Sequence, residues 1–179
     1  MKNKIGYILV VIVIIIAVIA TTYSWFTWKK DENRRIGLNI TTSGPKSECI
    51  VYSTSYKSGS KNLVPVSSRE KGYITNINIS KNCNSDIYVD FKLKIKDLAP
   101  TLKKEAFKYA LVKNNDTIGI GDFKDAKKED TINVASGEEI TSDLKNYEFY
   151  LCIDESSNSN LQIQNQKYEF DLSINVTDE

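Results

Sequence analysis

The amino-acid sequence predicts an all-β protein, an antiparallel β-sandwich preceded by a single N-terminal signal or transmembrane helix. Three observations predict it. Residues 36–179 contain many short runs in which apolar and polar side chains alternate, turn-forming residues separate these runs, and the chain begins with an uncharged apolar stretch. A strand places alternate side chains on opposite faces, so each run has one apolar face and one polar, solvent-exposed face. Many such strands with regular turn signals are typical of a sandwich.

Residues 1–28 form the hydrophobic segment. Lys2 and Lys4 precede an uncharged run over residues 5–20. This run is somewhat short for a membrane span, and it reaches a spanning length when it is extended to residue 28. We expect the membrane segment to include Ile5, Val10, Ile15 and Ala20. We expect the aromatic side chains that follow to anchor the segment at the headgroup boundary, and these are Tyr23, Trp25 and Trp28.

Two interpretations of this segment stay open. It is either an uncleaved signal anchor, or a signal peptide that is cleaved after a small residue such as Ala20 or Ser24. Both interpretations export the rest of the chain, which divides into a charged stalk at residues 29–35 and an extracytoplasmic β-sandwich at residues 36–179. The predicted location is therefore the outer face of a membrane, or the medium after cleavage.

The clearest strand patterns lie over residues 87–95, 147–153 and 168–176, where apolar residues occupy every second position. Weaker patterns occur at residues 36–40, 73–79 and 132–134, and residues 49–53 are a short candidate strand. Residues 101–109 fit a short helix that runs into a strand at about Phe107. We expect antiparallel pairing, because buried parallel strands read as continuous apolar runs rather than alternating ones.

Turns are predicted where Gly, Pro, Asn and Ser gather, including Ser136-Gly137. The Gly119-Ile120-Gly121 stretch lacks the third glycine and the Lys-Ser/Thr pair of a nucleotide-binding loop, so we interpret it as a turn beside a strand.

The composition argues against several functions. The chain has 24 basic and 23 acidic residues and a net charge of +1, which gives no electrostatic case for binding nucleic acid. It contains no histidine, so no Ser-His-Asp triad, Cys-His pair or HExxH metal site can form. We therefore expect a protein that is not an enzyme and that has no cofactor and no catalytic or metal-binding residues.

The three cysteines are Cys49, Cys83 and Cys152, and their spacing fits no zinc motif. Two interpretations stay open. All three are small buried hydrophobic residues, which is the preferred interpretation, or Cys49 and Cys83 form a disulfide because both lie beside predicted strand ends.

Four short stretches carry a family resemblance. TTYSWFTW (residues 21–28) resembles the end of the export signal in the TasA/camelysin group of Gram-positive surface proteins. NLVPVSS (62–68), IGIGDF (118–123) and YEFYLCID (147–154) resemble stretches of Bacillota proteins with the same layout. Those relatives tend to carry Trp where this chain has Cys152.

The resemblance implies a jelly-roll-like β-sandwich that is exported to the cell surface and that can assemble into fibres of a biofilm matrix. Metalloprotease activity, which was assigned to camelysin, is not expected in a chain without histidine. The resemblance also leads us to expect that residues 36–42 are a strand donated to a neighbouring copy.

We therefore expect a non-enzymatic structural or interaction protein of the cell surface, with the membrane and another surface protein or a second copy as partners. The alternative is a surface module that binds carbohydrate or calcium. Tyr52, Tyr56, Tyr73 and Tyr88 would favour a sugar site if they gathered on one exposed loop face. The acidic stretches at residues 122–130 and 154–160 offer oxygen ligands for calcium, although we expect solvated loops there. The stripe Lys92, Lys94 and Lys96 is interpreted as protection of a sheet edge.

Overall fold

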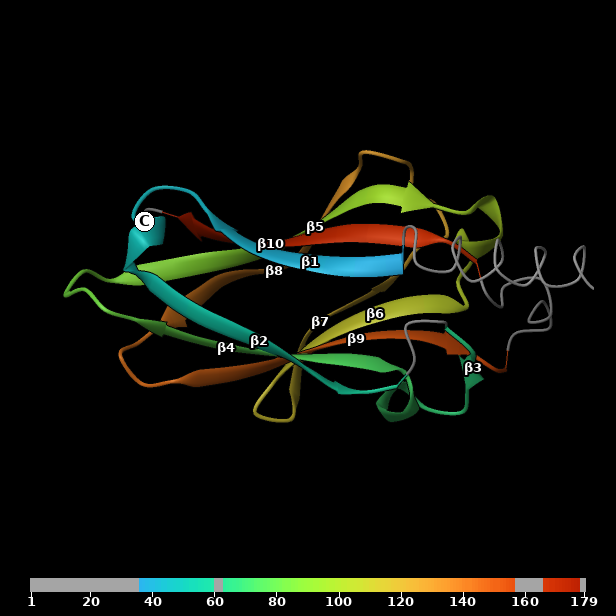
Figure 1. The fold of residues 1–179 in the computed structure, drawn as a ribbon, viewed down its shortest axis with the longest axis horizontal. Coiled ribbons are helices and arrows are strands. Elements are labelled where there is room, and N and C mark those ends of the chain that lie inside the picture. Colours follow the sequence, from blue (N-terminus) through green and yellow to red (C-terminus); the bar gives the residue numbers. More distant parts are fainter. Residues whose placement is uncertain (1–35, 60–62, 157–165, 178–179) are drawn as a thin grey trace, which may run out of the picture. The chain divides into compact units, whose positions relative to one another are not determined.

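The computed structural model describes residues 36–59, 63–156 and 166–177. This part of the chain is an all-β sandwich of two packed sheets (Figure 1). The first sheet has four strands, in the order β1 (Ile36–Ser43), β10 (Tyr168–Thr177), β5 (Ile87–Leu98) and β8 (Thr131–Ile140). The second has six, in the order β2 (Ile50–Ser58), β4 (Tyr73–Lys81), β9 (Lys145–Asp154), β6 (Phe107–Lys113) and β7 (Asp116–Asp122), with β3 (Pro65–Val66) paired to β9.

The predicted hydrophobic segment and stalk, residues 1–35, lie outside the described residues, and so do the proposed anchors and cleavage positions within them. Within residues 36–59, 63–156 and 166–177, no helix has the length and apolar character needed to cross a bilayer.

The alternating patterns form strands as predicted. The apolar residues of β5 and β10 are at most 1% exposed, whereas the residues between them are half-buried, apart from Leu98 at the end of β5. Strand β6 begins at Phe107 as predicted, but the helical part before it is only the 3₁₀ helix Pro100–Leu102. Two further 3₁₀ helices lie at Ser47–Cys49 and Arg69–Lys71.

Aromatic rings join the two sheets. Phe123, which follows β7, stacks on Phe170 of β10 with a centroid distance of 4.9 Å and an interplanar angle of 4°. Phe107 of β6 contacts both rings, at 4.6 Å from Phe123 and 6.2 Å from Phe170. All three side chains are fully buried. This cluster therefore fixes how the second sheet sits on the first.

The expectation of purely antiparallel pairing is wrong at two places. Strand β1 runs parallel to β10, and the short β3 runs parallel to β9. Parallel strands lose their alternating pattern only when both faces are buried. β1 is an edge strand whose residues Asn39 and Thr41 are exposed while Leu38 and Ile40 pack on the core, so its sequence alternates although its pairing is parallel.

The predicted turn at residues 119–121 is also wrong, because both glycines lie within strand β7. A Cβ at Gly119 would lie 2.1 Å from the backbone oxygen of Val134, and a Cβ at Gly121 would lie 2.3 Å from the Tyr109 hydroxyl. The glycines are needed because neighbouring groups approach this strand closely, which is a known role of glycine inside strands.

We expect Gly119→Ala to lower the free energy of unfolding by about 1–3 kcal/mol, because the added methyl group must displace the backbone of β8. Gly37→Ala is the matched control, since no atom lies within 4 Å of a Cβ at that position. Urea unfolding of both variants measures the difference, and equal stability of the two would contradict this packing.

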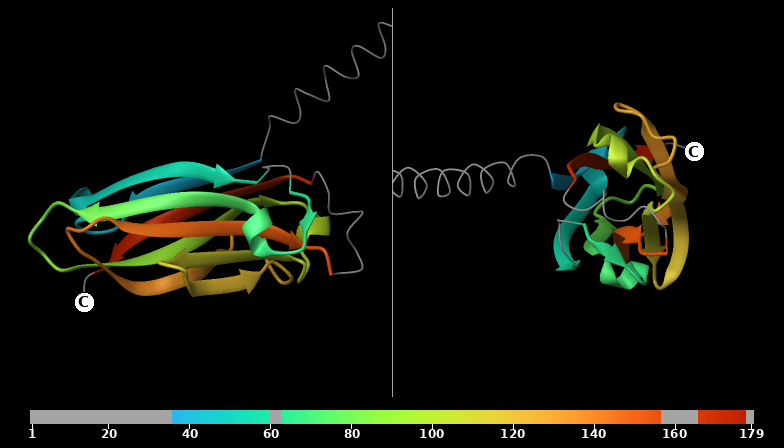
Figure 2. Two further views of the ribbon diagram at one scale, coloured as in Figure 1. Left: turned by 90° about the horizontal axis from the view of Figure 1, so that it is seen from below. Right: turned by 90° about the vertical axis from the view of Figure 1, so that its right-hand side faces the viewer.

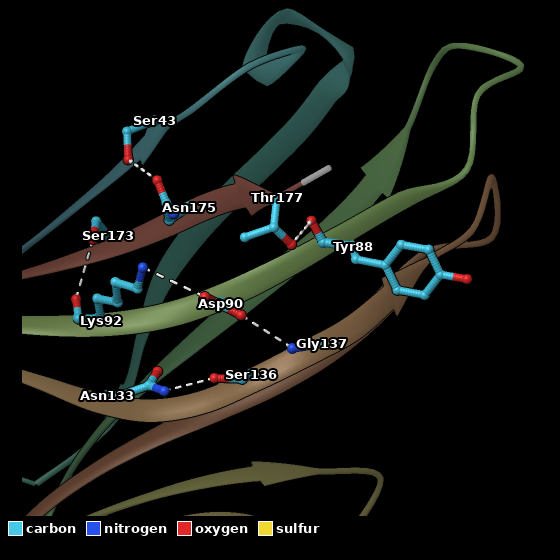
Figure 3. A network of polar contacts seen from close by, with 10 residues as sticks. All are labelled: Ser43, Tyr88, Asp90, Lys92, Asn133, Ser136, Gly137, Ser173, Asn175 and Thr177. Carbon is cyan, nitrogen blue, oxygen red and sulfur yellow. Dashed lines mark hydrogen bonds and ion pairs between the residues drawn. The ribbon is translucent and has the colours of Figure 1, made fainter. Parts of the chain in front are cut away.

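The predicted turn at Ser136-Gly137 is a bulge inside β8 instead. The pairing of β5 with β8 shifts register beside Asp90, and Gly137 has a φ of 67°. The Asp90 carboxylate accepts a hydrogen bond from the Gly137 amide at 3.1 Å, and it pairs with the Lys92 ammonium at 3.4 Å (Figure 3). A glycine with a positive φ is a feature of such bulges as well as of turns. The sequence therefore identified the special backbone position correctly, but β8 continues through it.

Candidate functional site

The two sheets contact each other through their edge strands along one side of the sandwich, which we call the closed side. Along the opposite, open side the edge strands that the structure describes do not pair. Along the closed side, strands β7 and β8 of the two sheets contact each other. Along the open side run the edge strands β1 of the first sheet and β2 of the second (Figure 2). The Tyr52 hydroxyl of β2 donates a hydrogen bond to the Ile40 carbonyl of β1 at 3.2 Å, which links the two edges.

Strand β2 is the most exposed strand of the described chain. Ile50 at its start is buried, but residues 51–57 are exposed on both faces of the strand. Val51 is 51% exposed and Tyr56 is 58% exposed. Among the described residues, β2 is hydrogen-bonded to β4 alone, so its other edge carries unpaired backbone groups. Exposed edges of this kind are templates for pairing with another strand.

A disulfide holds the beginning of this edge strand. Cys49 directly precedes β2, Cys83 follows β4, and the two are bonded with a Cα–Cα distance of 5.5 Å. The preferred interpretation of three unpaired cysteines is therefore wrong. The sequence does not show that antiparallel pairing of β2 with β4 brings these two positions opposite each other. Cys152 is free and buried, and burial raises the pKa of its thiol.

A groove lies on the outer face of the second sheet, with a volume of about 390 Å³. The Arg69 guanidinium lies 5.6 Å from the centre of the Tyr150 ring and donates to the Thr117 hydroxyl at 2.8 Å. The Lys108 ammonium pairs with the Asp154 carboxylate at 2.8 Å across the groove wall. Ile120, which is 67% exposed, adds an apolar patch. The groove thus combines aromatic, cationic and apolar groups.

The pKa values of Tyr150 and Asp154 are shifted furthest among the groove residues. Burial, together with the hydrogen bond that the Tyr150 hydroxyl donates to Glu148, raises the pKa of Tyr150 to about 12. The Lys108 ammonium and the hydroxyl and amide of Ser156 hold the pKa of Asp154 well below its ordinary value of 3.8. The raised pKa keeps the Tyr150 phenol neutral at neutral pH, and the lowered pKa keeps the Asp154 carboxylate charged. Neither group changes its protonation state near neutral pH, which fits a structural role.

We expect Asp154→Asn to lower stability at neutral pH and to make it less dependent on pH below 4. The pKa of Asp154 is lower in the folded state, so its contribution is present above the unfolded pKa and is lost as the pH falls towards the folded pKa. Urea unfolding between pH 7 and pH 2 should show the gap between wild type and variant narrowing below about pH 4. A gap that is constant over this range would contradict the proposed ion pair.

The sequence-predicted calcium ligands do not gather around an empty space. Asp154 is engaged by Lys108 and Ser156, and residues 157–160 lie outside the described part of the chain. In the second stretch, Glu129 pairs with Lys94 at 2.8 Å, and the Asp122 carboxylate accepts from the Lys124 amide at 2.9 Å. Among the described residues, no three Asp, Glu or Cys side chains are placed to hold a metal ion.

The four tyrosines considered for a sugar site are dispersed. Tyr52 and Tyr56 lie on the edge strand β2, Tyr73 is buried in the core, and Tyr88 is half-buried on β5. Tyr56 stacks on Tyr73 with a centroid distance of 5.8 Å. This distribution counts against a tyrosine-lined sugar site on one loop face.

The interpretation of the lysine stripe as edge protection is wrong. Strand β5 lies between β10 and β8, so it has no free edge to protect. Lys92, Lys94 and Lys96 instead pair with carboxylates on the same face, at 3.4 Å to Asp90, 2.8 Å to Glu129 and 3.2 Å to Asp171.

Sequence reasoning missed the exposed edge and the groove. The candidate strand at residues 49–53 was too short, because the residues beyond it are exposed on both faces and lack an apolar period. The groove residues Arg69, Lys108 and Tyr150 are far apart in the sequence. Lys108 and Tyr150 meet through the pairing of β6 with β9, and Arg69 lies in the 3₁₀ helix that contacts β9. Comparison of the chain with protein-family models, curated proteins and solved structures found no match.

Proposed function

We propose that this chain is a non-enzymatic protein of the cell surface, tethered by its N-terminal hydrophobic segment or released from it, whose β-sandwich binds other proteins through its open side. The exposed edge strand β2 is the observation that carries the proposal. Its residues 51–57 are exposed on both faces, and its free edge offers backbone donors and acceptors to an incoming strand.

Two further observations support an extracytoplasmic location. The uncharged run over residues 5–20 behind Lys2 and Lys4 has the character of an export signal or anchor. The Cys49–Cys83 disulfide fits an oxidising compartment, because disulfides persist mainly outside the cytosol. A jelly-roll-like arrangement and assembly into matrix fibres, which the family resemblance implies, belong to the same proposal.

Labelling of intact cells tests the location. Leu144, which is 67% exposed between β8 and β9, is replaced by cysteine, and expressing cells are treated with a maleimide that cannot cross membranes. The native chain is the matched control, because its described cysteines are either bonded or buried. We expect Leu144→Cys to be labelled equally on intact and lysed cells, with only background labelling of the native chain. Labelling that requires lysis would overturn the proposal.

The groove favours a second candidate function, a surface module that binds carbohydrate. Aromatic rings beside polar side chains suit sugars, and Tyr150 with Arg69 provides this pairing. Calorimetric titration of oligosaccharides into the native chain and into Tyr150→Ala tests it, with Tyr88→Ala as the control on the other sheet. Binding that is lost in Tyr150→Ala alone would establish this function, and the absence of heat with any oligosaccharide would exclude these ligands.

A further inference from the structure

The hydrogen bonds around β2 show which of its backbone groups are free. The Asn82 amide donates to the Cys49 carbonyl at 3.0 Å, one step before the pairing of Ile50 with Lys81, and the Lys81 amide points the other way, to Thr141. Hydrogen-bonded positions alternate along an antiparallel pair. Val51, Ser53 and Ser55 therefore bond to β4, whereas the amides and carbonyls of Tyr52, Thr54 and Tyr56 point away from the sheet.

The sequence of this free edge is a palindrome. Residues 52–56 read Tyr-Ser-Thr-Ser-Tyr, with Thr54 at the centre. If two copies pair antiparallel about a two-fold axis at Thr54, Tyr52 lies opposite Tyr56 of the second copy, and Ser53 lies opposite Ser55. Aromatic pairs and hydroxyl pairs directly opposite each other stabilise an antiparallel sheet. The strand is therefore complementary to itself, which is what a two-fold interface requires.

The backbone agrees with the same axis. The Thr54 amide and carbonyl point outward, so Thr54 and its symmetry mate can exchange two backbone hydrogen bonds. Tyr52 and Tyr56 of the second copy can exchange two more, because their amides and carbonyls also point outward. A register displaced by one residue would bring outward-pointing groups opposite groups that already bond to β4. Side-chain pairing and backbone pairing thus select one register.

No charge opposes this pairing. Lys57 is the only charged residue of β2, and in this register it lies opposite Val51 of the second copy. The edge strand β8 carries Glu138 and Glu139, and β7 carries Asp116 and Asp122 at its two ends. Charged residues are a common protection of edge strands, and residues 50–56 of β2 carry none.

We propose that β2 is a homotypic interface, through which a second copy of this chain extends the six-stranded sheet in the antiparallel register centred on Thr54. This inference rests on the proposed function and specifies its partner. Contact along one strand edge makes a small interface, which is typical of weak association in solution. Confinement of both copies to one membrane raises their effective concentration, so the tether favours pairing that would be weak between free molecules.

Disulfide cross-linking of the full chain tests the register. Thr54→Cys and the control Ser53→Cys are made in a Cys152→Ala background and are oxidised mildly in membranes and in detergent. Residues opposite each other in a hydrogen-bonded pair have Cα atoms about 5.5 Å apart, within the range of a disulfide, whereas the two copies of residue 53 lie diagonally at about 7–8 Å. We expect Thr54→Cys to form a dimer about tenfold faster than Ser53→Cys.

Three outcomes would overturn the inference. These are equal rates for the two variants, no dimer from either, and an adduct whose mass differs from twice that of the chain, which would identify a different partner. Labelling of Leu144→Cys on intact cells is independent of pairing. If that labelling succeeds and Thr54→Cys does not dimerise, the inference fails while the surface location stands.

A proline variant provides a second test. Among the described residues, β2 pairs with β4 alone and the Thr54 amide points away from β4, so Thr54→Pro is compatible with the edge of the folded sheet but removes a donor of the interface. We expect Thr54→Pro to abolish concentration-dependent association in sedimentation of the detergent-solubilised chain and Thr54→Val to retain it, with similar unfolding midpoints for both. Association that survives in Thr54→Pro would contradict the inference.

Discussion

Replacing Phe170 by alanine is expected to lower the free energy of unfolding by about 3–5 kcal/mol. The Phe170 ring is fully buried, stacks on Phe123 at 4.9 Å and contacts Phe107 at 6.2 Å. Its removal takes away the apolar area of the ring and leaves a cavity between the two sheets. The sheets cannot close this cavity, because the flanking residues Leu172 and Tyr168 are themselves buried in fixed positions on β10.

Urea unfolding followed by circular dichroism measures the effect. Ile120→Ala is the matched control, because Ile120 is a large apolar residue that is 67% exposed, and its loss should change stability by less than about 0.5 kcal/mol. If Phe170→Ala and Ile120→Ala lower the free energy of unfolding by the same amount, the Phe170 ring does not hold the two sheets together.

Removal of the Cys49–Cys83 disulfide is expected to lower the free energy of unfolding by about 3–4 kcal/mol, on the chain-entropy model for a sequence separation of 34 residues. The bond closes a loop that contains the whole of β2 and β4, so without it the unfolded chain gains freedom. The double variant Cys49→Ala/Cys83→Ala measures this cost in the same unfolding assay.

A reductant provides the control for this prediction. Dithiothreitol should destabilise the native chain by about the same amount as the double substitution, and it should leave the double variant unchanged. A native chain whose unfolding midpoint does not respond to the reductant would contradict a stabilising role for this disulfide.

Much of the fold was predictable because half-buried strands have a strong sequence signal. In β5 and β10 the alternation of apolar residues marks both the strand and its buried face. The errors arose where tertiary contacts override local signals. Gly119 and Gly137 carry turn chemistry but lie in strands, because β8 approaches β7 closely and because Asp90 binds the amide of a bulge. The parallel pairing of β1 could not be predicted from the sequence. An edge strand with one exposed face alternates in the same way whether its pairing is parallel or antiparallel.

The candidate site was less predictable for a related reason. An exposed edge has no buried face, so β2 shows no apolar period beyond Ile50. The palindrome at residues 52–56 is visible in the sequence. It indicates pairing between two copies only once the structure shows that β2 is an edge strand and that the Thr54 amide points away from β4. The groove depends on the register that brings Lys108 opposite Cys152, which no local pattern specifies.

We propose that residues 36–179 are exported behind the hydrophobic segment. The intact mass of the protein recovered from the membrane, medium and cytosolic fractions of expressing cells distinguishes export from retention in the cytosol. We expect the full-length mass in the membrane, or, in the medium or in insoluble fibres, the smaller mass of a chain that begins near Thr21 or Trp25. Recovery of the full-length chain from the soluble cytosolic fraction would contradict it.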